Sequence, residues 1–140
     1  MIPTRYTSPL SRKDKRIQLK SILKSRRDYK KGIYETRKNR KSYTNKKSSH
    51  IERAKVKFGV TSIIPSEELA KKSGCPLPVL KKIVQKGEGA YYSSGSRPNQ
   101  TPQSWGLARL ASALTGGPAA KVDAHLLEEC VPARRYKGSH

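Results

Sequence analysis

The stretch GCPLPVLKKIVQKGEGAYYSSGSRPNQTPQSWGLARLASALTGG, residues 74–117, decides the fold. It contains two apolar runs at helical spacing, separated by a segment rich in Gly, Ser, Pro and Asn. Pro78 suits the first position of one helix, and Gly87 predicts its C-terminal cap. Thr101 and Pro102 predict the start of a second, longer helix. We therefore expect two helices joined by a long, turn-rich loop.

Shorter elements are predicted on both sides of this pair. Ser66 is placed to cap a helix that begins with two glutamates and stops at Gly74. Asp123 is placed to cap a last helix, whose two leucines would pack back on the core. Upstream, the run VTSII, residues 60–64, fits a buried extended segment or a small strand.

These elements define the expected fold class, which is mainly α. Residues 58–130 would form a small helical domain of about four short helices, with room for one short strand and with Trp105 at its centre. Within the longest helix, Arg109 sits among apolar residues and should pair with a carboxylate or a carbonyl.

The remaining sequence is dominated by positive charge. The chain has 140 residues and a net charge of +21, of which residues 1–57 carry +16. We expect this segment to be a long basic arm, extended or partly helical, because it has too little apolar surface to offset its ordering entropy. Alone in solution it should be mostly disordered. Residues 131–140 would form a basic, polar tail.

One part of the arm has the pattern of a helix. Ser11 and Asp14 have the spacing of a capping pair, and Gly32 would end or bend the helix. Apolar residues follow near one helical face, at Leu19, Ile22, Leu23, Tyr29 and Ile33. One interpretation is a weak amphipathic helix that forms when docked, and the other is a basic helix laid against DNA or a groove in a partner.

Eleven basic residues are the candidate contacts with nucleic acid or another anion. They are Arg26, Arg27, Lys30, Lys31, Arg37, Lys38, Arg40, Lys41, Lys46, Lys47 and Arg97. Arg97 and the helix start near Thr101 could together hold a phosphate, and Tyr91 and Tyr92 could stack on bases. The alternative is that this loop only makes turns, with Arg97 solvated or paired with a helix end and the tyrosines covering the core.

The sequence makes no positive case for an enzyme, a metal site or a cofactor. His125 and Cys130 are five residues apart while Cys75 is remote, so a zinc site is not indicated. His125 also has no nucleophile placed against it by a readable motif. We interpret the two cysteines as reduced, partly buried thiols, with a single bridge between them as the alternative. We also expect no signal peptide and no membrane span.

Residues 74–123 resemble an uncharacterised domain found in large DNA viruses, especially algal ones, and in some tailed phages. The recurring pattern is a Gly-Cys-Pro start, a helix ending in Lys-Gly, an Arg-Pro turn, Trp, Ala-Arg and a Gly-rich stop. In this chain it falls on Gly74, Cys75, Pro76, Lys86, Gly87, Arg97, Pro98, Trp105, Ala108, Arg109, Gly116 and Gly117. The resemblance implies a viral origin and transfers no catalytic residue.

Charge and resemblance together give two functional hypotheses. The first is a non-catalytic viral structural protein, a minor capsid or capsid-lining component, whose basic arm binds an anionic capsid surface, packaged DNA or both. The alternative is a free, sequence-nonspecific nucleic-acid-binding protein acting in the infected cell. The expected partners are capsid proteins, nucleic acid or both. The expected locations are the virion and, during assembly, the host cytoplasm or nucleus.

Overall fold

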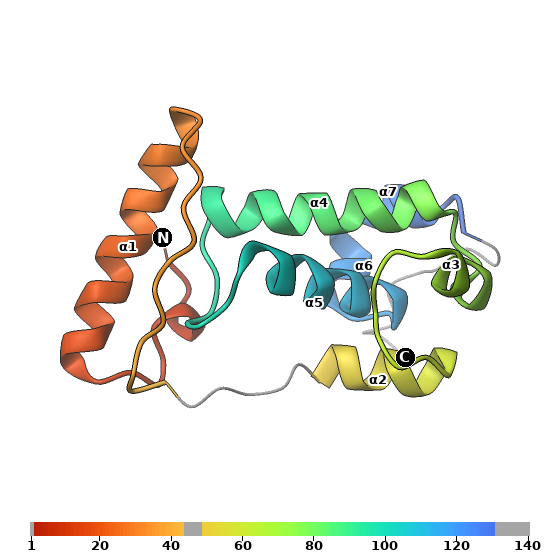
Figure 1. Ribbon diagram of the computed structural model, residues 1–140, viewed down its shortest axis with the longest axis horizontal. Coiled ribbons are helices and arrows are strands. Elements are labelled where there is room, and N and C mark those ends of the chain that lie inside the picture. The colour runs from red at the N-terminus through yellow and green to blue at the C-terminus, as the bar shows by residue number, and fades with distance from the viewer. Residues whose placement is uncertain (1, 44–48, 131–140) are drawn as a thin grey trace. The chain divides into compact units, whose positions relative to one another are not determined.

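A computed structural model describes residues 2–43 and 49–130, and this part of the chain is mainly helical, as predicted (Figure 1). Lys46, Lys47 and the predicted basic tail lie outside the described residues. The elements are the 3-10 helix η1 (Thr4–Tyr6) and the α-helices α1 (Arg12–Lys30), α2 (Ser49–Phe58), α3 (Glu67–Ser73), α4 (Leu77–Ser93), α5 (Pro102–Leu114), α6 (Pro118–Val122) and α7 (Ala124–Leu127).

Packing divides the chain into two compact units. Unit 1 comprises Met1–Lys46 and Glu88–Trp105, and unit 2 comprises Lys47–Gly87 and Gly106–His140. Helices α4 and α5 therefore contribute residues to both units. This division differs from the predicted boundary at residue 57, because the basic N-terminal segment packs with a later part of the same chain.

Unit 2 is organised around one apolar core. Helix α3 begins at Ser66, whose side chain accepts a hydrogen bond from the Leu69 amide, and ends at Gly74 in the left-handed conformation, as predicted. The core gathers side chains from α2 to α7, and its members are Ala54, Phe58, Ile63, Leu69, Cys75, Val79, Leu80, Ile83, Leu110, Ala111, Ala113, Leu114, Ala120, Leu127 and Cys130. All of α2 except Phe58 lies in the predicted arm, although its Ala54 belongs to this core.

Two further expectations for the predicted domain of residues 58–130 differ from the structure. Residues 60–64 contribute the buried Ile63 but form no strand in the described residues. Trp105 is only half-buried and belongs to unit 1, where its ring packs edge-on against Tyr6 at a centroid distance of 5.9 Å. The tryptophan is therefore not the centre of the core, because it lies in the first turn of α5, before the buried leucines.

Helices α4 and α5 approach each other at two glycines of unit 2. A Cβ atom on Gly87 would lie 2.6 Å from the Cα atom of Gly106, closer than atoms in proteins can approach. The prediction of a helix C-cap at Gly87 is therefore wrong, since α4 continues to Ser93. The glycine permits close helix contact instead of ending a helix.

Arg109 forms a bidentate ion pair inside unit 2. Its Nε and Nη2 atoms donate to the carboxylate oxygens of Asp123 at 2.9 and 2.7 Å. The Asp123 side chain is fully buried, so this carboxylate requires its charged partner. The predicted carboxylate partner of Arg109 is confirmed. Asp123 does precede α7, but its side chain makes no capping hydrogen bond because it binds Arg109.

Cys75 and Cys130 form a disulfide in unit 2, with their Cα atoms 4.1 Å apart. The interpretation of the two cysteines as reduced thiols is therefore wrong, and the alternative of a single bridge is correct. Sequence spacing could not show it, since 55 positions separate the two residues and only the packing of the core brings them together.

Unit 1 is built on α1 and on the chain that follows it, residues 31–43, which we call the return segment. Ser11 caps α1 by accepting a hydrogen bond from the Asp14 amide, as predicted. The return segment runs antiparallel to the helix, since Glu35 pairs with Lys24 while Ser42 bonds to Asp14 (Figure 1). The N-terminal segment is therefore folded against its own chain.

Gly87→Ala should destabilise the protein by about 1–3 kcal/mol, because the new methyl group meets backbone atoms that cannot move without separating α4 from α5. Gly89→Ala is the matched control in the same helix, where the added Cβ lies 3.7 Å from the Tyr29 hydroxyl in ordinary contact. It should stabilise α4 by up to about 1 kcal/mol. Urea unfolding measures both, and equal effects of the two variants would contradict the close helix contact.

Replacing both cysteines, Cys75→Ser with Cys130→Ser, should lower the free energy of unfolding by about 4 kcal/mol, because a crosslink across 55 positions restricts the unfolded chain. Urea unfolding without reductant measures the loss. The wild-type protein in excess reductant is the control and should fall to the stability of the variant. A double variant as stable as the oxidised wild type would exclude the bridge.

Candidate functional site

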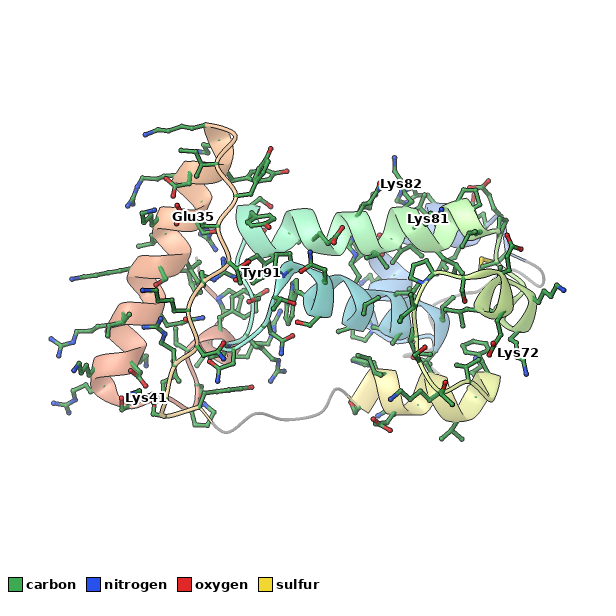
Figure 2. All side chains as sticks on the ribbon, viewed as in Figure 1. Glu35, Lys41, Lys72, Lys81, Lys82 and Tyr91 are labelled. Carbon is green, nitrogen blue, oxygen red and sulfur yellow. A yellow bond between two sulfur atoms is a disulfide. The ribbon has the colours of Figure 1, made fainter. Side chains whose placement is uncertain are left out.

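Arg37 joins several segments of unit 1. Its guanidinium lies 3.8 Å from the centre of the Tyr91 ring and donates to the Tyr91 carbonyl and to the hydroxyls of Ser25 and Ser96, at 2.9 to 3.0 Å. Its backbone amide donates to the Tyr91 hydroxyl at 2.7 Å. These contacts join the return segment to α1 and to the end of α4, where Tyr91 is labelled in Figure 2.

None of these partners of Arg37 is a carboxylate. Burial lowers the pKa of the guanidinium from its ordinary value, yet an arginine remains charged at any physiological pH. The cation is therefore stabilised by an aromatic face, a carbonyl and two hydroxyls, none of which neutralises it.

Further contacts hold the C-terminal end of the return segment. Ser42 donates to the Asp14 carboxylate from its hydroxyl at 2.6 Å and from its amide at 2.9 Å, and these bonds lower the pKa of Asp14. This contribution to stability is present above the ordinary pKa and is lost as the pH falls through the lowered value. Arg40 donates its amide to the Asn99 side chain at 2.6 Å.

The exposed face of α1 carries a row of cations, which we call the basic stripe. It consists of Lys13, Arg16, Lys20, Lys24 and Arg27, all of them exposed. Their spacing of three or four residues puts them on one side of the helix, opposite the buried Gln18 and Ile22. With a rise of about 1.5 Å per residue, the stripe extends for about 21 Å.

The two carboxylates of α1 offset only part of the charge of the stripe. Asp14 is held by Ser42, and Asp28 binds Lys24 at 2.7 Å. That hydrogen bond is the main reason why the pKa of Lys24 is raised, with a smaller contribution from Glu35. Lys13, Arg16, Lys20 and Arg27 remain the prominent cations of this face. Unit 1 as a whole has 17 basic and 4 acidic residues, a net charge of +13.

Three tyrosines gather at the C-terminal end of α1 and make the tyrosine cluster, Tyr29, Tyr34 and Tyr92. The rings of Tyr29 and Tyr92 are nearly parallel, with centroids 6.2 Å apart, and Tyr34 lies 5.5 and 5.3 Å from them. The pKa of the Tyr92 hydroxyl is raised, chiefly by burial, so this side chain stays neutral at physiological pH.

The predicted anion-binding residues fall into three groups. Arg26, Arg37 and Arg40 bind within unit 1; Arg26, for example, donates two hydrogen bonds to the Ser94 carbonyl. Lys46 and Lys47 lie outside the described residues. The exposed members are Arg27, Lys30, Lys31, Lys38, Lys41 and Arg97.

The predicted anion-binding residues do not include Lys13, Arg16, Lys20 and Lys24. A signal was present, since these residues recur at helical spacing opposite the apolar positions of α1. The sequence analysis does not identify Tyr29 and Tyr34 as candidate stacking residues. Only tertiary packing brings them next to Tyr92.

The loop expected from Gly87 to Thr101 is shorter in the structure, since α4 continues through Ser93. Tyr91 is fully buried, so its ring cannot stack on a base as proposed from the sequence. At the start of α5, the Ser104 amide donates to the Thr101 hydroxyl and the Thr101 amide donates to the Ser104 hydroxyl. These donors are therefore engaged within the chain, while Arg97 is exposed nearby.

In the described part of the chain, no three His, Cys, Asp or Glu residues lie close enough to share a metal ion. His125 instead has its Nε2 atom 3.2 Å from the Lys86 ammonium. None of the described helices combines the length and apolarity needed to cross a membrane.

The fold and surface define a small, mainly helical protein with a strongly basic first unit. The profile of the "Family of unknown function (DUF5824)" matches residues 3–126, so the chain belongs to this family. The match spans both units and confirms an uncharacterised domain family, over a longer region than the resemblance covered. Comparisons with curated proteins and with solved structures found no match.

Arg37→Ala should lower the stability of unit 1 by about 2–3 kcal/mol, because it removes several hydrogen bonds and the contact with the Tyr91 ring. Native-state hydrogen exchange at the amide of the buried Ile22 measures the loss. Lys38→Ala, at the exposed neighbouring position, is the control and should change stability by less than about 0.5 kcal/mol. Equal protection in the two variants would contradict the central role of Arg37.

Proposed function

We propose that this protein is a non-catalytic structural protein that binds nucleic acid without sequence preference through the basic stripe of α1. The observation that carries the proposal is the stripe itself, an exposed row of cations at helical spacing. Such a row suits the phosphate backbone, whose recognition needs positive charge and no reading of bases. A net charge of +13 on unit 1 would add long-range attraction.

The proposed setting is a virus particle, in which the protein would be a minor capsid or capsid-lining component in contact with packaged DNA. The resemblance to a domain of large DNA viruses and tailed phages supports this setting. The alternative setting is the infected cell, where a free protein would bind nucleic acid with the same stripe. Retention of many copies in particles washed with salt and nuclease supports the first setting, and release from them supports the second.

Lys13→Gln, Arg16→Gln and Lys20→Gln combined should weaken binding to a mixed-sequence duplex by about tenfold or more at 0.1 M salt. Loss of three phosphate contacts should also make the slope of log K against log salt shallower by about 2.7. Glutamine preserves the helix, because its helix propensity is close to those of Lys and Arg. Fluorescence anisotropy at several salt concentrations measures both effects.

The matched control replaces three exposed lysines of unit 2 by glutamine. They are Lys72, Lys81 and Lys82, which are labelled in Figure 2. This variant has the same net charge as the stripe variant and should keep most of the affinity and slope. If both variants lose affinity equally, total charge rather than the stripe drives binding. If neither loses affinity, the proposed function is wrong.

A further inference from the structure

The tyrosine cluster exposes aromatic surface that the fold of unit 1 leaves uncovered. Tyr34 is 60% exposed and Tyr29 is 37% exposed, and the neighbouring Ile33 is 44% exposed. Large apolar side chains grouped on a surface commonly mark a place of interaction. The cluster belongs to the same unit as the basic stripe.

The buried Tyr91 supports one ring of the cluster from the interior of unit 1. The buried Tyr91 packs edge-on against Tyr92 at a centroid distance of 5.2 Å. Tyr91 is itself held by the guanidinium and the backbone amide of Arg37. Tyr92 is therefore held in place by Tyr91 and Arg37. This reduces the entropy lost when a planar ligand stacks on the cluster.

Charge around the cluster indicates what kind of planar ligand would bind. Arg27, Lys30 and Lys31 lie within two residues of Tyr29 in the chain and are exposed. Of the nearby carboxylates, Asp28 and Glu35 lie 2.7 and 3.5 Å from the Lys24 ammonium, and Glu88 contributes to the raised pKa of Tyr92. Aromatic surface bordered by exposed cations suits a ligand that is both planar and anionic.

We infer that the tyrosine cluster stacks on unpaired bases of single-stranded nucleic acid, while the flanking cations bind the adjacent phosphates. This inference rests on the proposed function and adds a substrate class to it. A duplex keeps its bases stacked on one another, so the cluster adds affinity only for single strands. The basic stripe, by contrast, contributes to binding both forms.

The test uses the full chain and three oligonucleotides of equal length: oligo-dT, a mixed-sequence duplex and an abasic single strand. Tyr34→Leu keeps apolar area but removes the aromatic face, and it should weaken oligo-dT binding by about fivefold or more. Its affinity for the duplex and the abasic strand should stay within about twofold of wild type, with an unchanged salt slope. Tyr34→Phe keeps the ring and should bind oligo-dT like wild type.

Val122→Ala is the control for a substitution at an exposed apolar residue outside the cluster, and it should bind all three ligands normally. Thermal unfolding checks that each variant is folded. We expect the Tyr34 variants to fold, because the side chain they replace is exposed. Wild-type binding to oligo-dT no tighter than to the abasic strand would overturn the inference. So would a Tyr34→Leu variant with full oligo-dT affinity, which would leave the rings for a protein partner.

The stripe variant separates failure of this inference from failure of the proposed function. If it loses affinity for all three ligands while Tyr34→Leu loses none, the stacking inference fails and the proposed function stands. If the stripe variant binds all three ligands like wild type, the proposed function fails. A loss by Tyr34→Leu that is equal for duplex and oligo-dT also overturns stacking, since duplex bases are not available to the ring.

Discussion

The guanidinium of Arg37 on the ring of Tyr91 is the interaction on which unit 1 depends. The chain has 31 basic residues and only 10 acidic ones, so most of its cations cannot have a carboxylate of their own. Arg37 uses an aromatic face, a carbonyl and two hydroxyls instead. Arg26 bonds to the Ser94 carbonyl in the same way. Neutral groups of residues 91–96 thus hold the basic N-terminal segment, whose like charges would otherwise repel one another.

The use of neutral partners leaves the surface of unit 1 positively charged. Neutral acceptors orient a cation without cancelling its charge, so unit 1 is held together and still carries +13. Its described carboxylates mainly serve internal contacts, as Asp14 does with Ser42. In unit 2, by contrast, Arg109 and the buried Asp123 form an ion pair and neutralise each other. The physical basis of the proposed nucleic-acid binding is therefore the imbalance of charge in unit 1, with the stripe of α1 as its ordered part.

Local signals in the sequence were sufficient for the starts of α1, α3 and α5. Ser11, Ser66 and Thr101 each accept a hydrogen bond from an amide three residues later, and their residue types predicted it. Gly87 was misinterpreted because a glycine serves equally well to end a helix and to permit close contact between two helices. The exposed stripe could have been predicted from spacing. The tyrosine cluster could not, since it joins residues from α1, the return segment and α4.

The sequence by itself determined the helical class, the capped helix in the basic segment and the excess of positive charge, because these depend on composition and on neighbours within a few residues. Only the tertiary structure decided that Cys75 meets Cys130, that Arg37 binds Tyr91 and that three tyrosines share one surface. Each of these contacts joins residues from segments that are distant in the chain. Their formation depends on how the helices pack, and no local pattern of residue types records that packing.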